Sequence, residues 1–474
     1  MSAAAGGAAR CLSLLEWDQH YRRLKDAGLR EPWYGGPLRR HVDDGHDRRL
    51  LKLRFADSPA ALRLWNFLLT EESRLYAARA AGKKIVGTMK DLGTVPVMVY
   101  SLPNAVAFYP DGAWWAPCLM ELDEGCLAAA ARHGLDESFC PVRAMFGAFV
   151  TGTQFPRPDA LVCSVGATCD DFSAIAQRLE GLGFPILWWE MPARRRPEAG
   201  EKAVVLPGGS EAPLSQVAVV RAELERIRGS LEALSGQRLS EARLCAGIQA
   251  ANQVRRVLAR LRELAFRSPS CPLPALELLI AEMLAIHFCS DRAEALAVLS
   301  ELLVETERRA GSHLSSVQSK IEHPKSKIVS PARVFWVNPV ADLAVMNLLE
   351  SCGGCLCGTD FMFAHALDEI PEDLPPLEAL ARTALADPMV GPAQDRAERI
   401  CRDARAFGAE AVVVSRIPGA SHCALEGGII AAAVRSQLDL PVLELEVPPL
   451  SDALQAALRT RLEALVETIH RRRD

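Results

Sequence analysis

The chain has 474 residues, of which 49% are hydrophobic, and a formal net charge of −5 at neutral pH. This length and composition predict a globular protein of two to four domains, since a domain holds about 100–200 residues. The slightly acidic balance disfavours a nucleic-acid partner and favours small-molecule chemistry. Residues 1–10 lack a cationic start followed by a long apolar run, and no apolar run reaches the roughly 18 residues of a spanning helix. We therefore expect a cytoplasmic protein with no membrane partner.

The first half of the chain predicts a helical segment followed by an α/β lobe. Residues 1–80 carry charged helical patterns and are expected to form an N-terminal helical extension, with the first lobe at 81–205. Within that lobe, 160–164 has a strand pattern, 171–179 a helical pattern and 184–189 a second strand pattern. A strand–helix–strand unit of this kind indicates a parallel sheet with a right-handed crossover.

The second half predicts a helical domain and a second lobe. Helical periodicity dominates residues 206–325, and residues 326–474 return to an α/β pattern. In this last part, the strands expected at 410–415 and 441–445 flank a helix at 427–437. The predicted fold class is therefore α/β, with two Rossmann-like parallel-sheet lobes and a helical domain inserted between them.

Cysteines hold most of the functional information. There are fourteen, and a long chain without a signal peptide predicts reduced thiols or metal ligands rather than a disulfide framework. Cys140, Cys169 and Cys423 lie in or near loops that follow predicted strands. Open α/β sheets bind ligands outside the carboxyl ends of their strands. The sequence therefore predicts a site between the two lobes.

Three cysteine-bearing segments, taken in order, resemble those of the 2-hydroxyacyl-CoA dehydratase and benzoyl-CoA reductase family. They are Phe139-Cys-Pro-Val-Arg143, Thr168-Cys-Asp-Asp171 and Ser421-His-Cys-Ala-Leu-Glu426. Further similar blocks are found at 248–256, 337–361 and 460–464, and the resemblance covers roughly residues 81–470.

The resemblance implies a 4Fe-4S cluster held by Cys140, Cys169 and Cys423, with one iron left open to a small ligand or a substrate oxygen. It also implies an oxygen-sensitive, anaerobic enzyme that transfers low-potential electrons to an acyl-CoA, either as a dehydratase (a lyase) or as a benzoyl-CoA-type reductase (an oxidoreductase). The implied partners are a related second subunit in a heterodimer and an ATP-hydrolysing activator. The sequence holds no Walker phosphate loop, so any ATPase must be another chain.

The chain departs from the family in its first lobe. The family usually has an acidic residue and then a His after a Val-Pro pair, whereas Val95-Pro96 is followed here by apolar residues. Tyr100, Ser101 and Asn104 remain as polar catalytic candidates, and each is also typical of a loop hydrogen-bonder. The departure keeps open an alternative function, a non-catalytic cluster-binding subunit that relays electrons or acts as a scaffold.

Other motifs admit competing interpretations. The run Cys352-Gly-Gly-Cys-Leu-Cys357 is compatible with zinc if His365 or a distant Cys completes the site, with a double-cubane-type larger cluster, or with a packed Gly/Cys turn, which we favour. Arg194-Arg-Arg196 could pair with coenzyme A phosphates, but a solvated surface run is favoured. His422 beside Cys423 suggests a thiol hydrolase only if a third group orients the pair.

Overall fold

The computed structural model describes most of the chain from residue 58 onward. The described residues are 9–13, scattered positions between 15 and 26, 53–56, 58–89, 93–112, 123–269, 271–284, 290–321, 330–362, 366–448 and 452–474. Only the backbone is described at residues 69, 123–124, 312–321, 422–424 and 452–453. Trp114 and Trp115, His365, and the side chains of His422 and Cys423 therefore lie outside the described part.

The first lobe is built on a four-stranded, all-parallel sheet in the order β2-β1-β3-β4. Neighbouring residues of β1 face opposite sides of this sheet, as the alternation of a strand requires: Val86 joins the core shared with α6 and α11, whereas Ile85 packs with α9 and α10. The elements are β1 (Lys84–Met89), α6 (Val95–Tyr100), β2 (Ala105–Phe108), α9 (Ala144–Thr151), β3 (Ala160–Gly166), α10 (Asp170–Gly181), β4 (Ile186–Met191) and α11 (Leu214–Ser235).

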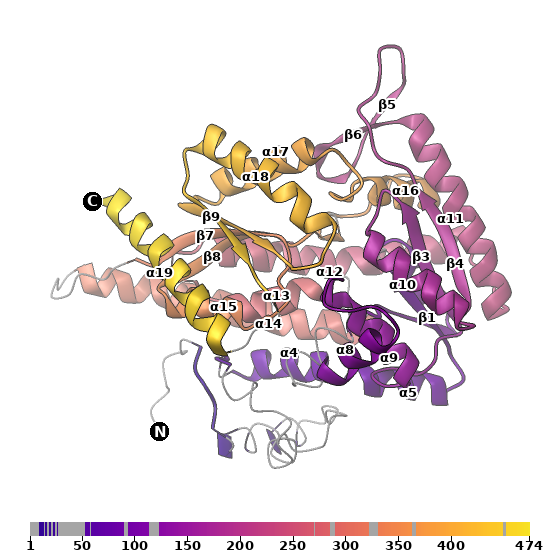
Figure 1. Ribbon diagram of the computed structural model, residues 1–474, viewed down its shortest axis with the longest axis horizontal. Coiled ribbons are helices and arrows are strands. Elements are labelled where there is room, and N and C mark those ends of the chain that lie inside the picture. The colour runs from indigo at the N-terminus through magenta and orange to yellow at the C-terminus, as the bar shows by residue number, and fades with distance from the viewer. Residues whose placement is uncertain are drawn as a thin grey trace.

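The second lobe repeats this topology. Its sheet is all-parallel in the order β10-β9-β7-β8, so that β7 and β9 take the central places that β1 and β3 have in the first sheet. Figure 1 shows the two sheets at opposite sides of the molecule. The elements are β7 (Ala332–Val337), α15 (Val345–Ser351), β8 (Gly354–Asp360), α16 (Pro376–Leu385), α17 (Ala393–Ala406), β9 (Ala411–Arg416), α18 (His422–Leu438), β10 (Val442–Glu446) and α19 (Asp452–Arg473).

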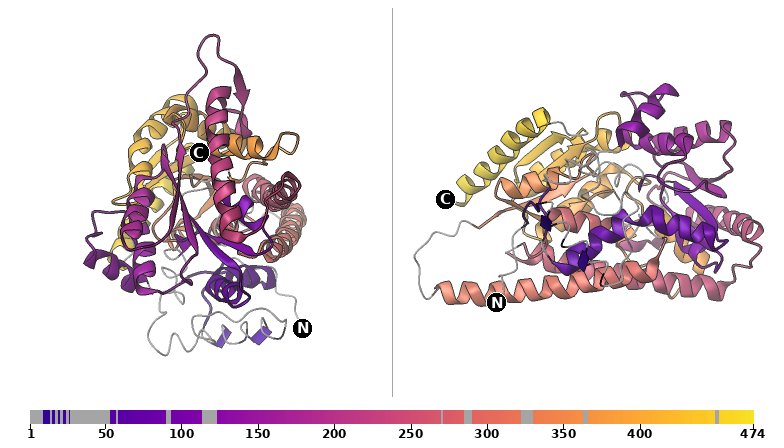
Figure 2. Two further views of the ribbon diagram at one scale, coloured as in Figure 1. Left: turned by 90° about the vertical axis from the view of Figure 1, so that its right-hand side faces the viewer. Right: turned by 90° about the horizontal axis from the view of Figure 1, so that it is seen from below.

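Helices between the lobes support both of them. Helix α11 contacts β4 of the first lobe and α16 of the second, and α12 (Glu241–Arg267) contacts both α6 and β8. The domain continues with α13 (Ala275–Met283) and the long α14 (Arg292–Ile321), which runs along one side of the molecule (Figure 2, right). The predicted fold class, two parallel-sheet lobes with a helical domain between them, is confirmed.

The segment before the first lobe packs on the helical domain. Helix α4 (Pro59–Leu69) contacts α13 and α14, and α5 (Glu71–Ala80) contacts β1. Ser58 caps α4 by accepting a hydrogen bond from the Ala61 amide. Trp65 is buried, with its ring 4.8 Å from that of Phe55. The described end of the expected extension is therefore part of the main core.

This core contains a carboxyl group that makes folding stability depend on pH. Glu277 of α13 is fully buried, and its Oε1 accepts a hydrogen bond of 2.8 Å from the Ala56 amide, while Oε2 finds no partner among the described residues. Burial raises the pKa of Glu277 from 4.5 to about 7. The folded state therefore binds this proton more tightly than the unfolded state, so stability is lost as the pH rises from about 4.5 to about 7.

Glutamine cannot ionise, so it avoids the buried negative charge that Glu277 acquires as the pH rises. We therefore expect Glu277→Gln to stabilise the protein relative to wild type more at pH 8 than at pH 5.5. The full penalty for the ionised carboxylate is roughly 3 kcal/mol above pH 7. Denaturant unfolding under anaerobic conditions at the two pH values measures the difference. Glu263→Gln, at an exposed position of α12, is the control. An equal effect of Glu277→Gln at both pH values would show that Glu277 does not titrate in this range.

Candidate functional site between the lobes

Two of the three predicted ligands occupy equivalent places in the two lobes. Cys169 follows β3 and is the N-cap of α10, and Cys423 follows β9 and is the second residue of α18. Each central strand pair, β1/β3 and β7/β9, is the point where connections leave a sheet in opposite directions, the usual ligand-binding position of such sheets. Amide groups at a helix start also favour a thiolate. Both positions therefore suit a ligand to a cationic metal group.

The loop before α18 lies directly on the segment of the third cysteine. A Cβ atom built on Gly419 would be 2.7 Å from the carbonyl carbon of Phe139 and 3.0 Å from the amide nitrogen of Cys140. Gly419 also has φ +75°, a conformation that favours glycine. No side chain fits there without moving the backbone. The two lobes therefore meet at Cys140 through a contact that requires glycine.

A buried carboxylate joins the loop of Cys169 to the loop of Cys423. Asp171 Oδ2 accepts hydrogen bonds of 3.3 Å from both the amide and the hydroxyl of Ser421, two residues before Cys423. The same oxygen lies 3.8 Å from the Cys169 sulfur. Burial raises the pKa of Asp171 above its usual value, while the bonds from Ser421 act in the opposite direction. Asp171 thus fixes the relative position of two predicted ligand segments.

Cys140 is buried next to a buried cation. It precedes the short 3-10 helix η1 (Pro141–Arg143), whose Arg143 donates a 2.7 Å hydrogen bond to the Phe139 carbonyl. Burial lowers the pKa of Arg143, and the nearby Cys140 thiolate opposes this. The apolar cluster around Cys140 also includes Cys169 and, from the second lobe, Ile417. A guanidinium in such surroundings stabilises negative charge on sulfur.

Cys163 is close to the same place but is not suited to act as a ligand. It lies within β3 and is fully buried, and burial, followed by the charge of Cys169, raises the pKa of its thiol. A neutral thiol inside a strand has the properties of a small apolar side chain. Proximity alone therefore does not define the ligand set.

A buried ionic network holds the N-terminal part of α18. Arg396 of α17 donates a hydrogen bond of 2.9 Å to Glu426, three residues after Cys423. It donates a second one, of 2.7 Å, to the Asn338 side chain at the end of β7. It also pairs with Asp360, the last residue of β8, at 3.2 Å. Burial alone would lower the pKa of Arg396, but Asp360 and Glu426 raise it. The helix start that carries Cys423 is thereby tied to the strand ends of its own sheet.

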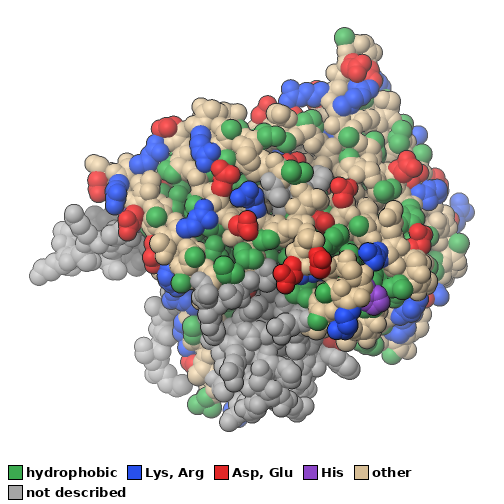
Figure 3. All heavy atoms as spheres, in the orientation of Figure 1, with side chains coloured by type: hydrophobic (Ala, Val, Ile, Leu, Met, Phe, Trp, Pro, Cys, Tyr) green, Lys and Arg blue, Asp and Glu red, His purple; other side chains and the backbone are tan. Residues whose placement is uncertain are grey.

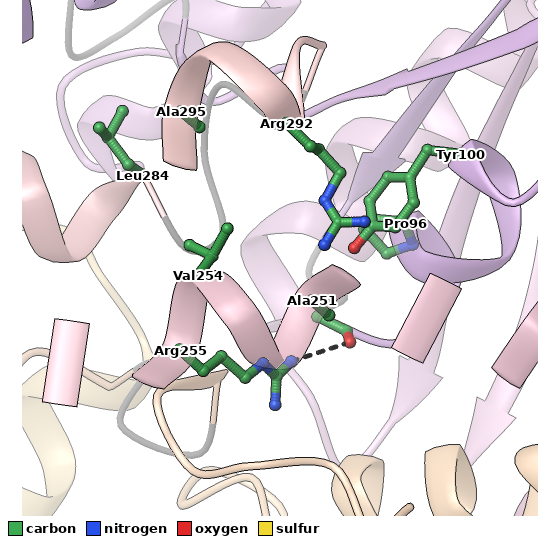
Figure 4. Close-up of a pocket in the computed structure, with 9 residues that line it drawn as sticks. Pro96, Tyr100, Ala251, Val254, Arg255, Leu284, Arg292 and Ala295 are labelled. Atoms are coloured by element: carbon green, nitrogen blue, oxygen red, sulfur yellow. Dashed lines mark hydrogen bonds between the residues drawn. The ribbon is translucent and has the colours of Figure 1, made fainter. Parts of the chain in front are cut away.

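A pocket lies beside the loop after β1. It is lined by α6, by α12 and by the ends of α13 and α14, and it is small, with a volume of about 20 Å³. Tyr100 lies in its wall, with the Arg292 guanidinium 3.6 Å from its ring centroid (Figure 4). Arg255 contributes a second cation. Neither arginine was predicted as a site residue, because 155 and more residues separate them from Tyr100 in the sequence.

The structure separates the other two polar candidates of the first lobe from this pocket. The Ser101 hydroxyl donates a hydrogen bond of 2.6 Å to the Val97 carbonyl. It also lies so close to Gly247 that a Cβ atom on Gly247 would be 2.0 Å from the Ser101 hydroxyl oxygen. Asn104 donates 2.8 Å to the Ser235 carbonyl, next to the amino end of β2 and therefore at the sheet edge away from the ligand-binding loops. Both contacts are structural. Among the three candidates, Tyr100 is the one that lines the pocket.

The dense cysteine run is a turn that continues into a strand. Cys352 follows α15, and its sulfur lies 3.8 Å from the Arg459 carbonyl. Cys355 and Cys357 are buried in β8, where the nearby Cys271 thiol lowers the pKa of Cys355. Cys355 and Cys357 both lie near Arg333 and Glu410, whereas Cys352 lies near Arg459, which does not favour one metal shared by all three thiols.

The arginine run at 194–196 is only partly a surface run. Arg194 is buried and pairs with Asp395 at 3.3 Å, whereas Arg195 and Arg196 are exposed. The favoured interpretation, a solvated surface run, is therefore wrong for Arg194. Its ion pair with Asp395 connects the loop after β4 to α17. On the face shown in Figure 3, acidic and basic side chains are interspersed.

The described residues contain neither a ready-made metal site nor a membrane-spanning helix. Among them, no group of three or more His, Cys, Asp or Glu side chains is arranged to hold a metal ion, and the Cys423 side chain is outside this set. None of the helices that the structure describes combines the length and apolar character needed to cross a membrane.

Two α/β lobes of equal topology that meet through cysteine-bearing loops define a class of two-lobed parallel-sheet proteins. The family model of the 2-hydroxyglutaryl-CoA dehydratase D-component matches residues 93–469. The chain belongs to this family, and the predicted resemblance is confirmed. No individually curated protein is similar enough to the chain to count as a match.

Proposed function

We propose that this protein is the iron–sulfur subunit of an acyl-CoA dehydratase system, with a 4Fe-4S cluster held by Cys140, Cys169 and Cys423. The observation that carries the proposal is the meeting of the three cysteine segments at the switch points of both sheets, through Gly419 and Asp171. Family membership supports the dehydratase class. Reduction of an aromatic or unsaturated acyl-CoA is the second reaction that the same residues would serve.

The donor set fits such a group. Thiolates are the usual ligands of iron–sulfur clusters, and helix starts together with buried Arg143 lower the free energy of their ionised form. The bound cluster would supply low-potential electrons and an open iron for a substrate oxygen. Asp171 and Arg396 would hold the ligand loops in place, and the close contact at Gly419 would keep water from Cys140.

The low potential required for an acyl-CoA radical reaction calls for partners. We propose a related second subunit and an ATP-hydrolysing activator that delivers the electron, since the family description of a D-component implies an assembly of components. The acyl-CoA substrate would bind at the edge where β1 and β3 end, because the pocket is lined by Gly93 of the loop that follows β1.

A non-catalytic electron-relay or scaffold subunit is the alternative. It is favoured by the pocket itself, whose described lining contains no carboxylate or imidazole to move a proton. In that function, the same cysteines would hold the cluster and the partner subunit would carry the acid/base groups.

Anaerobic purification of the chain alone, and together with its activator and second subunit, tests the proposal. We expect iron in the isolated chain. In the presence of ATP, we expect the assembly to dehydrate a 2-hydroxyacyl-CoA, which is measured as the loss of one water from the substrate. An assembly that contains iron and transfers electrons to a dye but not to any acyl-CoA would favour the relay function. A chain without iron would contradict both.

A further inference from the structure

The pocket beside Tyr100 brings together two arginines that have no carboxylate partner in the described part of the chain. Arg255 comes from α12 and Arg292 from the first turn of α14. Neither forms an ion pair with any residue that the structure describes, although most arginines around them do. Two unneutralised cations in one pocket need an explanation, because a buried charge is unfavourable without a partner.

Arg255 is held in place by neutral groups. Its Nη1 donates a hydrogen bond of 2.6 Å to the Asp368 backbone carbonyl, and its Nη2 donates one of 3.1 Å to the Gly93 carbonyl. Burial lowers the pKa of Arg255 to about 10, so the group keeps its charge at neutral pH. The two carbonyls orient the guanidinium, and the Asp368 carboxylate, which forms its ion pair with Arg399, acts on Arg255 only at longer range. Gly93 closes this contact, since a Cβ on it would lie 2.5 Å from Nη2 of Arg255.

Arg292 approaches from the opposite wall and is half-buried. Its guanidinium stacks on the Tyr100 ring, which fixes its plane. Figure 4 shows the Arg292 guanidinium against Tyr100 and the Arg255 side chain extending from α12 below it, and both residues line the pocket. The remaining described lining is mostly apolar and includes no Asp or Glu; it consists of Gly93, Pro96, Ala251, Val254, Leu284 and Ala295. A small pocket with oriented donors and apolar walls is typical of a specific ligand site.

We propose that this pocket binds an oxyanion of the acyl-CoA substrate, a carboxylate or a phosphate, between Arg255 and Arg292. Guanidinium groups match the oxygen atoms of both anions. The inference rests on the proposed function for the identity of the molecule that carries the anion. Its geometric support is independent of the cluster: the two cations, their lack of a described acidic partner and the pocket's place next to the loop after β1.

The test measures binding of three thioesters to the full chain by isothermal titration calorimetry. Glutaryl-CoA carries an acyl carboxylate, pentanoyl-CoA has the same acyl length without it, and 3′-dephospho-pentanoyl-CoA also lacks one phosphate. The variants are Arg292→Met and Arg292→Lys, with Arg260→Met as the control at an exposed position of α12. Arg292 is half-buried at a helix start, so its replacement is compatible with folding, and the thermal unfolding midpoint verifies this.

We expect Arg292→Met to weaken binding about tenfold or more, Arg292→Lys to weaken it less, and Arg260→Met to leave it unchanged. A loss confined to glutaryl-CoA assigns the acyl carboxylate to the pocket. A loss for the two thioesters that carry the 3′-phosphate, but not for the dephospho compound, assigns the 3′-phosphate to the pocket. An equal loss for all three assigns the pyrophosphate. Equal affinities of wild type and Arg292→Met for every thioester, or no binding by wild type, would overturn the proposal.

Iron content separates this inference from the proposed function. Arg292→Met should keep the iron of wild type, while Cys169→Ser should lose iron but retain binding that depends on Arg292. A pocket that fails to bind any thioester in a chain with full iron content would contradict the anion site alone. Anion binding in a chain that never holds iron would contradict the cluster alone.

Discussion

Replacement of Cys169 by serine is expected to remove the cluster or reduce the iron content to less than half that of wild type. Cys169 is the N-cap of α10, half-buried, and is tied through Asp171 to the loop that leads to Cys423. Serine preserves the shape of the side chain, but its oxygen is a much poorer ligand for cluster iron than a thiolate. The same loss is expected for Cys140→Ser and Cys423→Ser, measured by iron analysis and low-temperature electron paramagnetic resonance.

Matched cysteine variants make this test selective. Cys245 is exposed and Cys352 is half-buried near the Arg459 carbonyl, so serine at either position should leave the spin signal intact. Cys355 and Cys357 are buried in β8, and alanine is the better replacement there because a buried hydroxyl would add an unpaired polar group. If the variants in the 352–357 run lost the cluster while Cys423→Ser kept it, the proposed ligand set would be wrong.

Replacement of Arg396 by methionine is expected to have the largest effect on stability, a loss of about 3–5 kcal/mol. The Arg396 side chain is fully buried and pairs with Asp360 at 3.2 Å and Glu426 at 2.9 Å. Methionine preserves the aliphatic length but leaves both carboxylates buried without their cation. Anaerobic denaturant unfolding measures the loss. Because Glu426 lies three residues after Cys423 in α18, we also expect a lower iron content.

Arg402→Met provides the control on the same helix. Arg402 is 58% exposed and pairs only with neighbouring Asp403 among the described residues, so its replacement should change stability by no more than about 0.5 kcal/mol. Arg396→Lys keeps one charge but not the fork that reaches three partners, and an intermediate stability is expected. Equal stabilities of Arg396→Met and Arg402→Met would mean that the buried network does not hold α18.

Local patterns were sufficient to predict the lobes and the placement of the cysteines. The strands expected at 160–164 and 410–415 are the cores of β3 and β9, because β-branched runs bounded by turn residues are a short-range signal. Parallel strands with helical crossovers place the following loops at one edge. The positions of Cys169 and Cys423 at helix starts follow from these two facts.

The remaining features depend on contacts between distant parts of the chain. Asp171 and Ser421 are 250 residues apart, and a carboxylate next to a cysteine has no local pattern that distinguishes a link between lobes from a helix cap. Arg255 and Arg292 lie on different helices, and their shared pocket exists only after α12 and α14 pack. The Cys352–Cys357 run was expected to be a turn; its Gly353 forms the turn, but Cys355 and Cys357 continue into β8.

Mössbauer spectroscopy of the chain reconstituted without oxygen with iron-57 tests the central claim most directly, because it resolves the ligands of each iron. Three thiolates from Cys140, Cys169 and Cys423 predict about four irons per chain, three of them alike and one distinct because it lacks a protein thiolate. Four equivalent sulfur-ligated irons, or less than about one iron per chain, would contradict a cluster held by these three cysteines between the lobes.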